Sequence, residues 1–526
     1  MKRTTLFCLA LCLSLSHTMA QESWEPLPKE SEVDICIYGA TSAGITAAVE
    51  ARRQGHSVLL IEPGGRIGGL TAGGLGETDI GKVEIIQGLS LNFYRRVGQV
   101  YGSDQPVFRF EPKVALKVYR QMLNEAGVKV YMHRRMAGVK KRGNEIQSIL
   151  LERASERIGQ KRARVTAKVF IDCSYEGDLM AWAGVTYTVG REGDKAYGEE
   201  FNGLHMREYH QFPDGVDPYR EKGNPRSGLL WGILPGEMGQ KGQADKRVQA
   251  YNFRLTVTND PQNRIPFTRP ERYDSTRYEL LLRWKEVEPW RRGINDCFAW
   301  SLMPNHKTDV NNRGALSTDM IGENWDYPEA NYKKRQKIYQ KHVDYTLGLL
   351  WFVASDPRIP EAVRREIGEW GWPRDEYEEN NHFTPQLYIR ESRRMVGRYV
   401  MTQANCQRKA SVDDAVGWAA YTMDSHNTGR YVVNGMVKNE GDVEIPIPGK
   451  YDVSYRSLTP QEQEARNLLV PVCLSASHIA YGSIRMEPVF MVLGQSAALA
   501  ACQAIEQHNG CVQQVDAAQV MARFRE

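Results

Sequence analysis

The sequence predicts an α/β fold: a Rossmann-like domain, made of a β-α-β unit and a β-meander, with a large α+β domain inserted into it. Three observations predict this. An apolar, β-forming run (33–38) ends in a glycine turn and enters a helical sequence (45–54). A second apolar run (58–61) is followed by an acid. Apolar strand and helix patterns return after residue 456, beyond a long loop-rich stretch, as expected when one fold is split by an insertion.

The first β-α-β unit carries the residues of a dinucleotide site. Gly39 permits a tight turn, and Gly44 lets the helix pack close to the strand. The helix N-terminus offers free N–H groups to a pyrophosphate, and Glu62 stands where an acid accepts hydrogen bonds from ribose hydroxyls. One position departs from the GxGxxG pattern, because Thr41 replaces its middle glycine. An ordinary β-α-β unit with a glycine turn is the alternative.

Length and charge exclude several classes of protein. A chain of 526 residues, 41% hydrophobic, is too long for a single core, so we expect two or three domains. A formal net charge of +4 indicates no nucleic-acid partner. No apolar run after the N-terminus is long enough to span a membrane. A basic start, an apolar run (6–15) and a small-residue pattern (18–20) predict a cleaved signal peptide over residues 1–20.

Cysteine usage agrees with export. Nine cysteines, of which Cys8 and Cys12 fall in the signal peptide, leave seven in the mature chain, without a CxxC pair. We therefore expect few or no disulfides, with Cys502 and Cys511 as the one pair considered. Export with few disulfides is typical of a bacterial protein that is periplasmic or secreted.

The elements that follow the first unit alternate between strands and helices. Up to residue 174 we expect a glycine run at 64–76, a helix at 113–126, a strand at 128–132, and a β-meander near 139, 146–151 and 164–171, with turns at 143–144 and 158–159. The last strand of the meander (169–174) is apolar and is expected to rejoin the first sheet.

Beyond residue 185 the chain is richer in loops. We expect a strand at 251–258, helices near 271–286, 329–350 and 360–370, a strand at 468–474, a turn at 482–485 and a small-residue helix at 489–507. The first domain would then comprise residues 21–190 and 456–526, and the inserted substrate domain residues 191–455.

Eight ordered motifs make the chain resemble a known family. They are GATSAGI (39–45), RIGGLTAGGLGETD (66–79), FIDCSYEGDLMAWAGVTYTVGRE (170–192), QAYNFRLTVTNDPQNRIPF (249–267), LMPNHKTDVNN (302–312), YIRESRRMVGRYVMT (388–402), YRSLTP (455–460) and NLLVPVCLSASHIAYGSIRMEPVFMVLGQSAALAA (467–501). They are similar to those of secreted, FAD-dependent oxidoreductases of the glutathione-reductase-like flavoprotein class, and they extend over nearly the whole mature chain. The turns of such proteins also tolerate a replaced middle glycine.

The resemblance implies an extended FAD. Its pyrophosphate is expected at the first turn, its adenine at the backbone of Met136, and Arg66 would neutralise phosphate charge. The helix that begins near Pro488 would point its N-terminus at the flavin, where a positive dipole end stabilises the anionic reduced form. The full set of expected FAD-binding residues is Gly39, Thr41, Ser42, Ala43, Gly44, Glu62, Pro63, Gly64, Arg66, Gly69, Leu70, Thr71, Met136, Cys173, Ser174, Arg485, Glu487, Pro488, Gly494 and Gln495.

Two histidines and an arginine are the candidates for catalysis. A flavin that oxidises an alcohol or amine requires a base to take the substrate proton. His478 precedes Arg485 by seven residues, and His426 has polar neighbours that can orient an imidazole. A structural histidine in the core is the alternative for each. Arg390 is a candidate for binding substrate or flavin, and a structural ion pair is its alternative.

The polar strip Asn305, Lys307, Asp309 and Asn311 suits hydrogen bonding to a polyol. It lacks the full pattern of a cation-binding loop, so no metal is expected. We therefore expect a secreted flavoprotein that uses FAD to dehydrogenate a small polar substrate, with a carbohydrate favoured and the electron acceptor unknown. The alternatives are an FAD-containing lyase or isomerase that acts on saccharides without net redox, and a noncatalytic periplasmic carbohydrate-binding protein.

Overall fold

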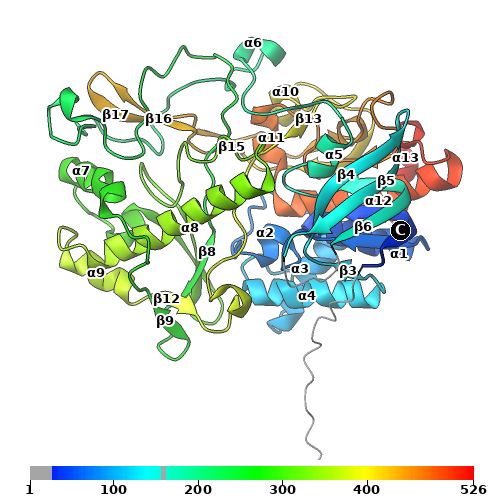
Figure 1. The fold of residues 1–526 in the computed structure, drawn as a ribbon, viewed down its shortest axis with the longest axis horizontal. Helices are drawn as coiled ribbons and strands as arrows, with labels where there is room; N and C mark the ends of the chain where they lie inside the picture. Colours follow the sequence, from blue (N-terminus) through cyan, green and yellow to red (C-terminus); the bar gives the residue numbers. More distant parts are fainter. Residues whose placement is uncertain (1–26, 156–160, 526) are drawn as a thin grey trace, which may run out of the picture.

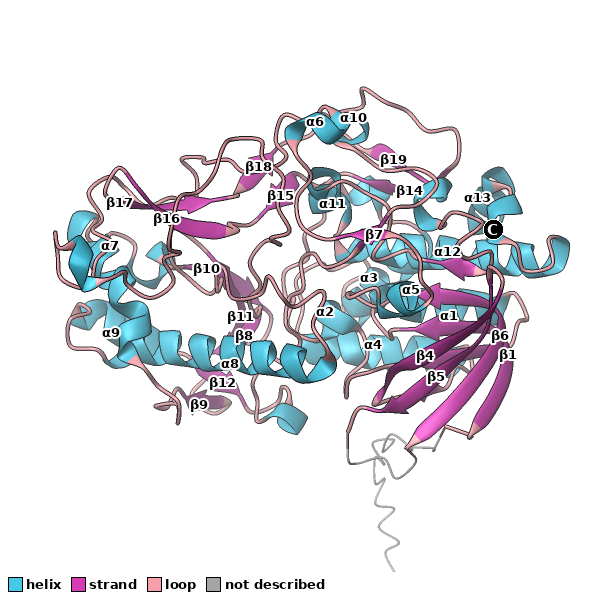
Figure 2. Cartoon of the chain, turned by 45° about the horizontal axis from the view of Figure 1, so that its top comes forward, coloured by secondary structure: helices cyan, strands magenta, loops and turns pink. Residues whose placement is uncertain are grey.

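The computed structural model describes residues 27–155 and 161–525. The predicted signal peptide (1–20) and the predicted turn at 158–159 lie outside the described residues. Within them the chain forms two halves, each built on its own sheet (Figure 1). The long helix α8 (Tyr332–Ser355) runs along the second half toward the first (Figures 1 and 2).

A seven-stranded sheet organises the first half. Its strands are β1 (Glu30–Tyr38), β2 (Val58–Ile61), β3 (Val130–Tyr131), β4 (Arg134–Arg142), β5 (Glu145–Arg153), β6 (Arg162–Asp172) and β20 (Leu468–Leu469). They lie in the order β3-β2-β1-β6-β5-β4, and β20 pairs with the end of β6. β3, β2, β1, β6 and β20 run parallel, whereas β4, β5 and β6 form an antiparallel meander. The predicted return of the meander to the first sheet is therefore confirmed.

Two helices pack closely against this sheet and against each other. They are α1 (Ser42–Arg53) and α12 (Glu487–Gln507). A Cβ atom on Gly494 would lie 2.3 Å from the carbonyl oxygen of Ala43, so only glycine permits this approach. Thr46 Oγ1 donates a hydrogen bond to the carbonyl oxygen of Met491 at 2.8 Å. α12 is long and apolar enough to cross a membrane, but 94% of its most apolar window is buried inside the protein. It is the core helix of this half.

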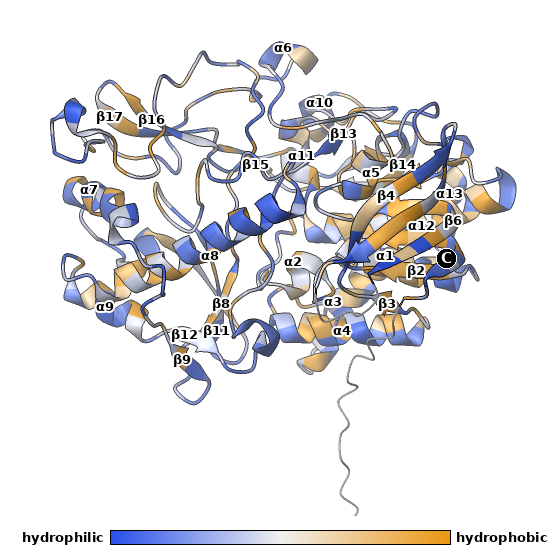
Figure 3. Ribbon diagram, viewed as in Figure 1, coloured by the Kyte–Doolittle hydropathy of each residue, from blue (hydrophilic) through white to orange (hydrophobic). Residues whose placement is uncertain are grey.

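The first half contains six further helices among the described residues. They are α2 (Gly69–Ala72), α3 (Gly88–Val100), α4 (Pro112–Glu125), α5 (Asp178–Trp182), α11 (His478–Ile484) and α13 (Ala517–Arg525). α3 and α13 pack on α12, and α4 packs on α3. Figure 3 shows apolar residues gathered on the seven-stranded sheet and α12, whereas much of α8 is hydrophilic. The main core of the protein is therefore centred on α12.

The second half is built on an antiparallel five-stranded sheet. Its order is β10-β11-β8-β12-β9. The strands are β8 (Leu255–Thr258), β9 (Arg264–Pro266), β10 (Phe298–Met303), β11 (Lys307–Asn312) and β12 (Gly371–Pro373), and the helices besides α8 are α7 (Glu279–Val287) and α9 (Glu361–Gly368). The helices expected near 329–350 and 360–370 are present as α8 and α9. The one expected at 271–286 is shorter and begins later, as α7.

Four small sheets connect the halves. They are β7 (Tyr187–Thr188) with β13 (Arg394–Met395), β14 (Ala415–Ala419) with β19 (Tyr451–Ser454), β15 (Met423–Ser425) with β18 (Val443–Ile445), and β16 (Gly429–Val433) with β17 (Met436–Glu440). Two short helices belong to the same part of the chain: α6 (Asp194–Tyr197) follows β7 in the sequence, and α10 (Gln403–Cys406) lies between β13 and β14. β14 packs on α12, and β15 packs on α11. Strands from the predicted inserted domain therefore cover the first half, and the domain boundaries stay a prediction.

The predicted turn at 482–485 is wrong. Residues 482–484 form the last turn of α11, and the chain breaks only at Arg485 and Met486. Ser477 caps α11 by accepting a hydrogen bond from the N–H of Ala480, which favours a helix where composition alone indicated a turn.

All seven described cysteines are buried and free, so Cys502 and Cys511 do not pair.

Replacing Gly494 with alanine should destabilise the fold by about 3 kcal/mol, because the added methyl group overlaps the Ala43 carbonyl and forces α1 from α12. Urea unfolding measures this free energy. Gly368 is the matched control, since it also lies in a helix but a Cβ there meets nothing within 4 Å. Gly368→Ala should change stability by less than about 1 kcal/mol. Equal effects from the two variants would contradict the close contact.

Candidate active site

Thr41, the departure from the glycine pattern, caps α1. Its Oγ1 accepts a hydrogen bond from the N–H of Gly44 at 3.3 Å and donates one to the carbonyl oxygen of Cys173 at 2.8 Å. Its backbone is extended, with φ of −69°, so the position does not require glycine. The side chain thus adds two hydrogen bonds that a glycine would lack.

Gly39 holds the turn against the end of β6. Its φ is +96°, and a Cβ atom there would lie 2.7 Å from the backbone nitrogen of Ser174. Ser174 Oγ donates to Asp172 at 2.6 Å, and the buried Cys173 contributes backbone bonds alone. Both predicted residues of the returning strand therefore lie directly beside the turn.

Glu62 lies at the end of β2 beside the same turn. Its carboxylate accepts hydrogen bonds from the N–H groups of Ala40 at 2.9 Å and Gly64 at 2.6 Å. Burial raises the pKa of Glu62 to about 7, although these two N–H groups oppose the shift. Pro63, also predicted to bind the cofactor, stands between Glu62 and Gly64 in the sequence. The predicted ribose ligand is thus tied to the turn on one side and to the glycine run on the other.

The glycine run packs against protein side chains. A Cβ on Gly69 would lie 2.3 Å from Tyr175 OH, which accepts a hydrogen bond from the N–H of Leu70 at 2.9 Å. Arg66 donates to the carbonyl oxygen of Ala72 and forms an ion pair with Glu379 at 2.5 Å. Contacts within the protein are sufficient to require glycine at position 69, and the guanidinium of Arg66 already has an acidic partner.

Met136 belongs to β4 and is completely buried. Its N–H donates to Tyr38 OH at 3.3 Å, and its carbonyl oxygen accepts a hydrogen bond from Tyr332 OH at 3.0 Å. The backbone through which adenine recognition was predicted is therefore engaged with two tyrosines.

The break between α11 and α12 directs neighbouring side chains to two different places. Arg485 donates to Tyr388 OH at 2.6 Å and to Asp424 at 2.7 Å, on the side of the second half. Glu487 accepts hydrogen bonds from Thr71 Oγ1 and from Tyr175 OH, on the side of the glycine run. Beyond Pro488, the predicted cofactor residues Gly494 and Gln495 contact protein: Gly494 touches α1, and Gln495 bonds to Leu89 and Glu50.

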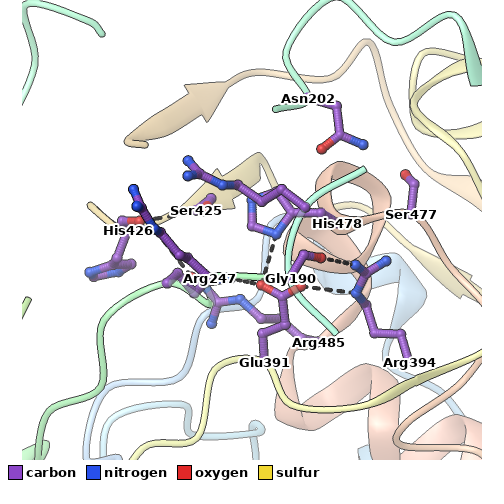
Figure 4. Close-up of polar contacts among 12 residues, drawn as sticks. Gly190, Asn202, Arg247, Glu391, Arg394, Ser425, His426, Ser477, His478 and Arg485 are labelled. Carbon is purple, nitrogen blue, oxygen red and sulfur yellow. Dashed lines mark hydrogen bonds and ion pairs between the residues drawn. The ribbon is translucent and has the colours of Figure 1, made fainter. Parts of the chain in front are cut away.

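His478, the first residue of α11, belongs to a buried charge network. Its Nδ1 lies 2.7 Å from one oxygen of Glu391, whose other oxygen lies 2.9 Å from Arg394 Nε (Figure 4). Burial raises the pKa of Glu391, but His478 and Arg394 outweigh it and hold the pKa below its ordinary value. An ionised carboxylate only accepts hydrogen bonds, so Nδ1 carries the hydrogen. Nε2 of His478 is buried and has no hydrogen-bond partner within the described residues.

His426, which follows β15, has a parallel arrangement. Its Nδ1 lies 2.6 Å from one oxygen of Asp319, and the other oxygen lies 3.1 Å from a terminal nitrogen of Arg390. Burial raises the pKa of Asp319, but Arg390 and then His426 lower it overall. His426 Nε2 lies 3.9 Å from Asp424. This imidazole is 13% exposed, whereas His478 is fully buried.

Gln249 joins the two histidine–carboxylate pairs. Its Oε1 accepts a hydrogen bond from the N–H of His426 at 3.1 Å, and its Nε2 donates to Glu391 at 3.4 Å. Sequence reasoning missed Gln249 and Asp319. Each comes from an irregular segment far in sequence from its partners, so no spacing pattern connects them. The structure thus brings together all three predicted catalytic residues, His478, His426 and Arg390.

The predicted substrate strip divides among three environments. Lys307 is fully buried and forms ion pairs with Glu111, Asp375 and Glu376 at 2.6, 2.9 and 3.0 Å. Asn305 donates to the same Glu111 at 2.6 Å. These two residues therefore belong to an ion cluster that joins α4 to the second half.

The remaining members of the strip, Asp309 and Asn311, contact the glycine run and Asn252. Asp309 is buried, pairs with Arg254 at 2.6 Å, and accepts hydrogen bonds from the backbone N–H groups of residues 76 and 77. It thereby fastens the end of the glycine run. Asn311 accepts a hydrogen bond from Asn252 at 3.1 Å, and Asn252 Oδ1 accepts one from Arg390 at 3.0 Å. Asn311 is the member of the strip that reaches the catalytic candidates.

Comparison with known proteins identifies the family. The sequence model of the FAD dependent oxidoreductase family matches residues 34–524. The chain belongs to this family. Its cofactor is FAD, and the two parts of the first half form a Rossmann-like FAD-binding α/β fold. A search of curated proteins found no match.

Several solved structures are similar over a part of the chain. Thermovibrio ammonificans THI4 is 18% identical, with 31% of this chain and 66% of that chain covered and a TM-score of 0.24. A flavoprotein/dehydrogenase from Cytophaga hutchinsonii is 16% identical (30% and 42% covered, TM-score 0.24), and an L-amino acid deaminase from Proteus vulgaris is 15% identical (32% and 53% covered, TM-score 0.23). The chain covers less than two thirds of each of these proteins, and the scores are too low to bear on its activity.

The residues at the start of α1 fit FAD. The helix N-terminus presents backbone N–H groups and a positive dipole end to a phosphate, and α1 has no acidic residue in its first turn to compete. Ser42 Oγ lies in that turn, buried beside the Glu487 carboxyl group but without a hydrogen bond of ordinary geometry among the described residues. Glu62 lies beside the same turn, and its carboxylate accepts a hydrogen bond from the N–H of Ala40. This donor and acceptor set suits an anionic dinucleotide.

Replacing Lys307 with methionine should cost about 3–5 kcal/mol of folding free energy at pH 7.5, because three carboxylates lose their shared cation. The cost should shrink at pH 5.5. Burial raises the pKa of Glu376 to about 7, so at pH 5.5 this side chain is protonated and does not need a cation. As the pH rises through 7, Glu376 ionises, the stability that its protonated form contributes is lost, and the fold depends more on Lys307. Urea unfolding at the two pH values measures this.

Lys334→Met, which removes an exposed pair with Asp326, is the matched control and should change stability by less than about 1 kcal/mol. A Lys307→Met protein of unchanged stability that binds substrate poorly would instead place Lys307 in the substrate site.

Proposed function

We propose that this FAD-dependent oxidoreductase dehydrogenates a small polyhydroxylated substrate, a carbohydrate, with a carboxylate-oriented imidazole as the base. The observation that carries the proposal is the linked arrangement His478–Glu391 and His426–Asp319, bridged by Gln249. In each pair an ionised carboxylate holds Nδ1–H, which leaves Nε2 to accept a proton.

FAD supplies the acceptor for the hydride that leaves the substrate carbon. The protein must take the proton of the reacting hydroxyl group. An imidazole does so through Nε2, and the carboxylate behind Nδ1 then stabilises the imidazolium that forms. His478 is preorganised for this step by its fixed ring, whereas His426 lies nearer to solvent and suits exchange of the proton with water.

Amides and hydroxyls near Arg390 support a polyol as substrate. The buried Asn252 bonds at once to Arg390, Asn311 and Thr318, and so holds a row of donors and acceptors next to Asp319, the partner of His426. Such paired donors and acceptors match the alternating hydroxyl groups of a sugar. A lyase or isomerase that uses FAD on a saccharide without net redox could use the same groups, and it is the second candidate.

Anaerobic mixing of the holoprotein with a panel of monosaccharides, disaccharides and uronic acids distinguishes these functions. A dehydrogenase substrate should bleach the flavin band near 450 nm in the absence of any added acceptor. His478→Asn and His426→Asn should slow this reduction by about 10²–10⁴-fold for the variant that removes the base, with little change in bound FAD.

His56→Asn is the control, because His56 bonds to Glu506 at the far end of α1 and should leave the rate unchanged. Conversion of a saccharide without bleaching would favour the non-redox function. A protein that binds saccharides but neither bleaches nor converts them would contradict both enzymatic proposals.

We also propose that the protein is exported and that residues 1–20 are removed as a signal peptide. The basic start, apolar run and small-residue pattern support this proposal. Expression of the full chain in a Gram-negative host should yield a periplasmic protein whose first residue is Gln21. N-terminal sequencing checks this, and a cytoplasmic protein that retains Met1 would contradict it.

A further inference from the structure

Glu487 is a buried acid at the point where the two ends of the FAD-binding half meet. It is the first residue of α12 and is 3% exposed. Oε2 accepts a hydrogen bond from Thr71 Oγ1 and Oε1 accepts one from Tyr175 OH, both at 2.7 Å. Thr71 lies in α2, within the glycine run, and Tyr175 follows β6. One carboxyl group therefore contacts both segments beside the dinucleotide turn.

No cation compensates this acid within the described part of the chain. The side chains that face it carry hydroxyls: Thr71, Tyr175 and, from the first turn of α1, Ser42, with Tyr94 and Tyr119 farther out. The backbone N–H of Thr71 also faces the carboxyl group, and these neutral donors oppose the effect of burial without supplying a positive charge. Arg485, two residues earlier, points away toward Tyr388 and Asp424. An unpaired charge in such surroundings carries a large desolvation cost, and the usual response is to bind a proton. Burial accordingly raises the pKa of Glu487.

The position of Ser42 connects this acid to FAD. Ser42 stands in the first turn of α1, whose N-terminus is the phosphate site, and its hydroxyl faces the Glu487 carboxyl. FAD brings two negatively charged phosphates into this region. An ionised Glu487 would add like-charge repulsion in a site closed to water, whereas a neutral carboxylic acid would offer an O–H donor to an oxygen of the cofactor.

We propose that Glu487 acts as a protonated carboxylic acid that donates a hydrogen bond to FAD, so that FAD binding takes up or retains a proton at this residue. Deprotonation of Glu487 then weakens FAD binding. The site is a proton-linked cofactor contact, and it rests on FAD as the cofactor, not on the proposed substrate.

A second titrating group must be separated from this effect. Glu62 also faces the cofactor region, and burial raises its pKa to about 7. Glu62 has the opposite dependence, because a ribose hydroxyl donates to its ionised form. The two effects partly cancel in the natural protein as pH rises. Asp172, buried behind Ser174 at the end of β6, is a third acid of this region, and burial raises its pKa to about 6. The test therefore uses the Glu62→Gln background and compares it with and without Glu487→Gln, because Asp172 is the same in both proteins.

The experiment measures the dissociation constant of FAD between pH 5.5 and 8.5. Holoprotein is dialysed at each pH against known concentrations of FAD, and the retained flavin is quantified by absorbance. In Glu62→Gln, the dissociation constant should rise with pH, by as much as tenfold per unit once Glu487 titrates. In Glu62→Gln combined with Glu487→Gln, it should stay low and constant, because the amide is a permanent neutral donor.

Two further variants make the result unambiguous. Glu487→Asp in the same background keeps a titratable acid, shortens its reach and should preserve the pH slope with weaker binding. Glu506→Gln, an exposed acid at the end of α12, should leave the slope unchanged. FAD binding that is independent of pH in Glu62→Gln would overturn the proposal. So would loss of FAD by a folded Glu487→Gln protein, because an ionised carboxylate would then be the required form.

Discussion

The helices α1 and α12 touch directly in the core of the FAD-binding half. This contact joins segments 445 positions apart, through the hydrogen bond from Thr46 to Met491 and the fit of Gly494 against Ala43. Because α1 begins at the turn after β1 and α12 begins at the α11–α12 break, the separation of the helices sets the distance between that turn and that break. A single methyl group at position 494 would change that distance. Stability and the relative placement of the two helix N-termini therefore depend on the same contact.

Buried arginines impose a second constraint. Arg390, Arg394 and Arg485 are almost completely buried, and each requires an acidic partner, which Asp319, Glu391 and Asp424 supply. Two of those partners, Asp319 and Glu391, also hold a histidine. Buried ion pairs add little net stability compared with an apolar core. Their effect here is to orient two imidazoles and to keep the carboxylates behind them ionised.

The two ends of the chain were predictable because their signals are local. The strand–turn–helix of β1 and α1, the meander of β4 to β6, and helices α4 and α12 follow from apolar periodicity and glycine placement. Even Thr41 is explained locally, as an N-cap. The turn expected at 482–485 was wrong because small residues that indicate a turn in isolation are also the ones that let α11 pack closely. A Cβ on Gly482 would lie 2.4 Å from the Asp424 carbonyl oxygen.

The polar residues of the second half show where local information ends. Lys307, Asp309 and Asn311 alternate along β11 and share one side of it, yet they contact an acidic cluster, the glycine run and the region of Arg390 in turn. The FAD-binding half is predictable from the amino-acid order, because steric and hydrophobic requirements act between near neighbours. Which histidine meets which carboxylate, and that Glu487 has no cation beside it among the described residues, depends on how distant segments pack together. The partner of a buried charge is chosen by the docking of distant segments, and no spacing along the chain encodes it.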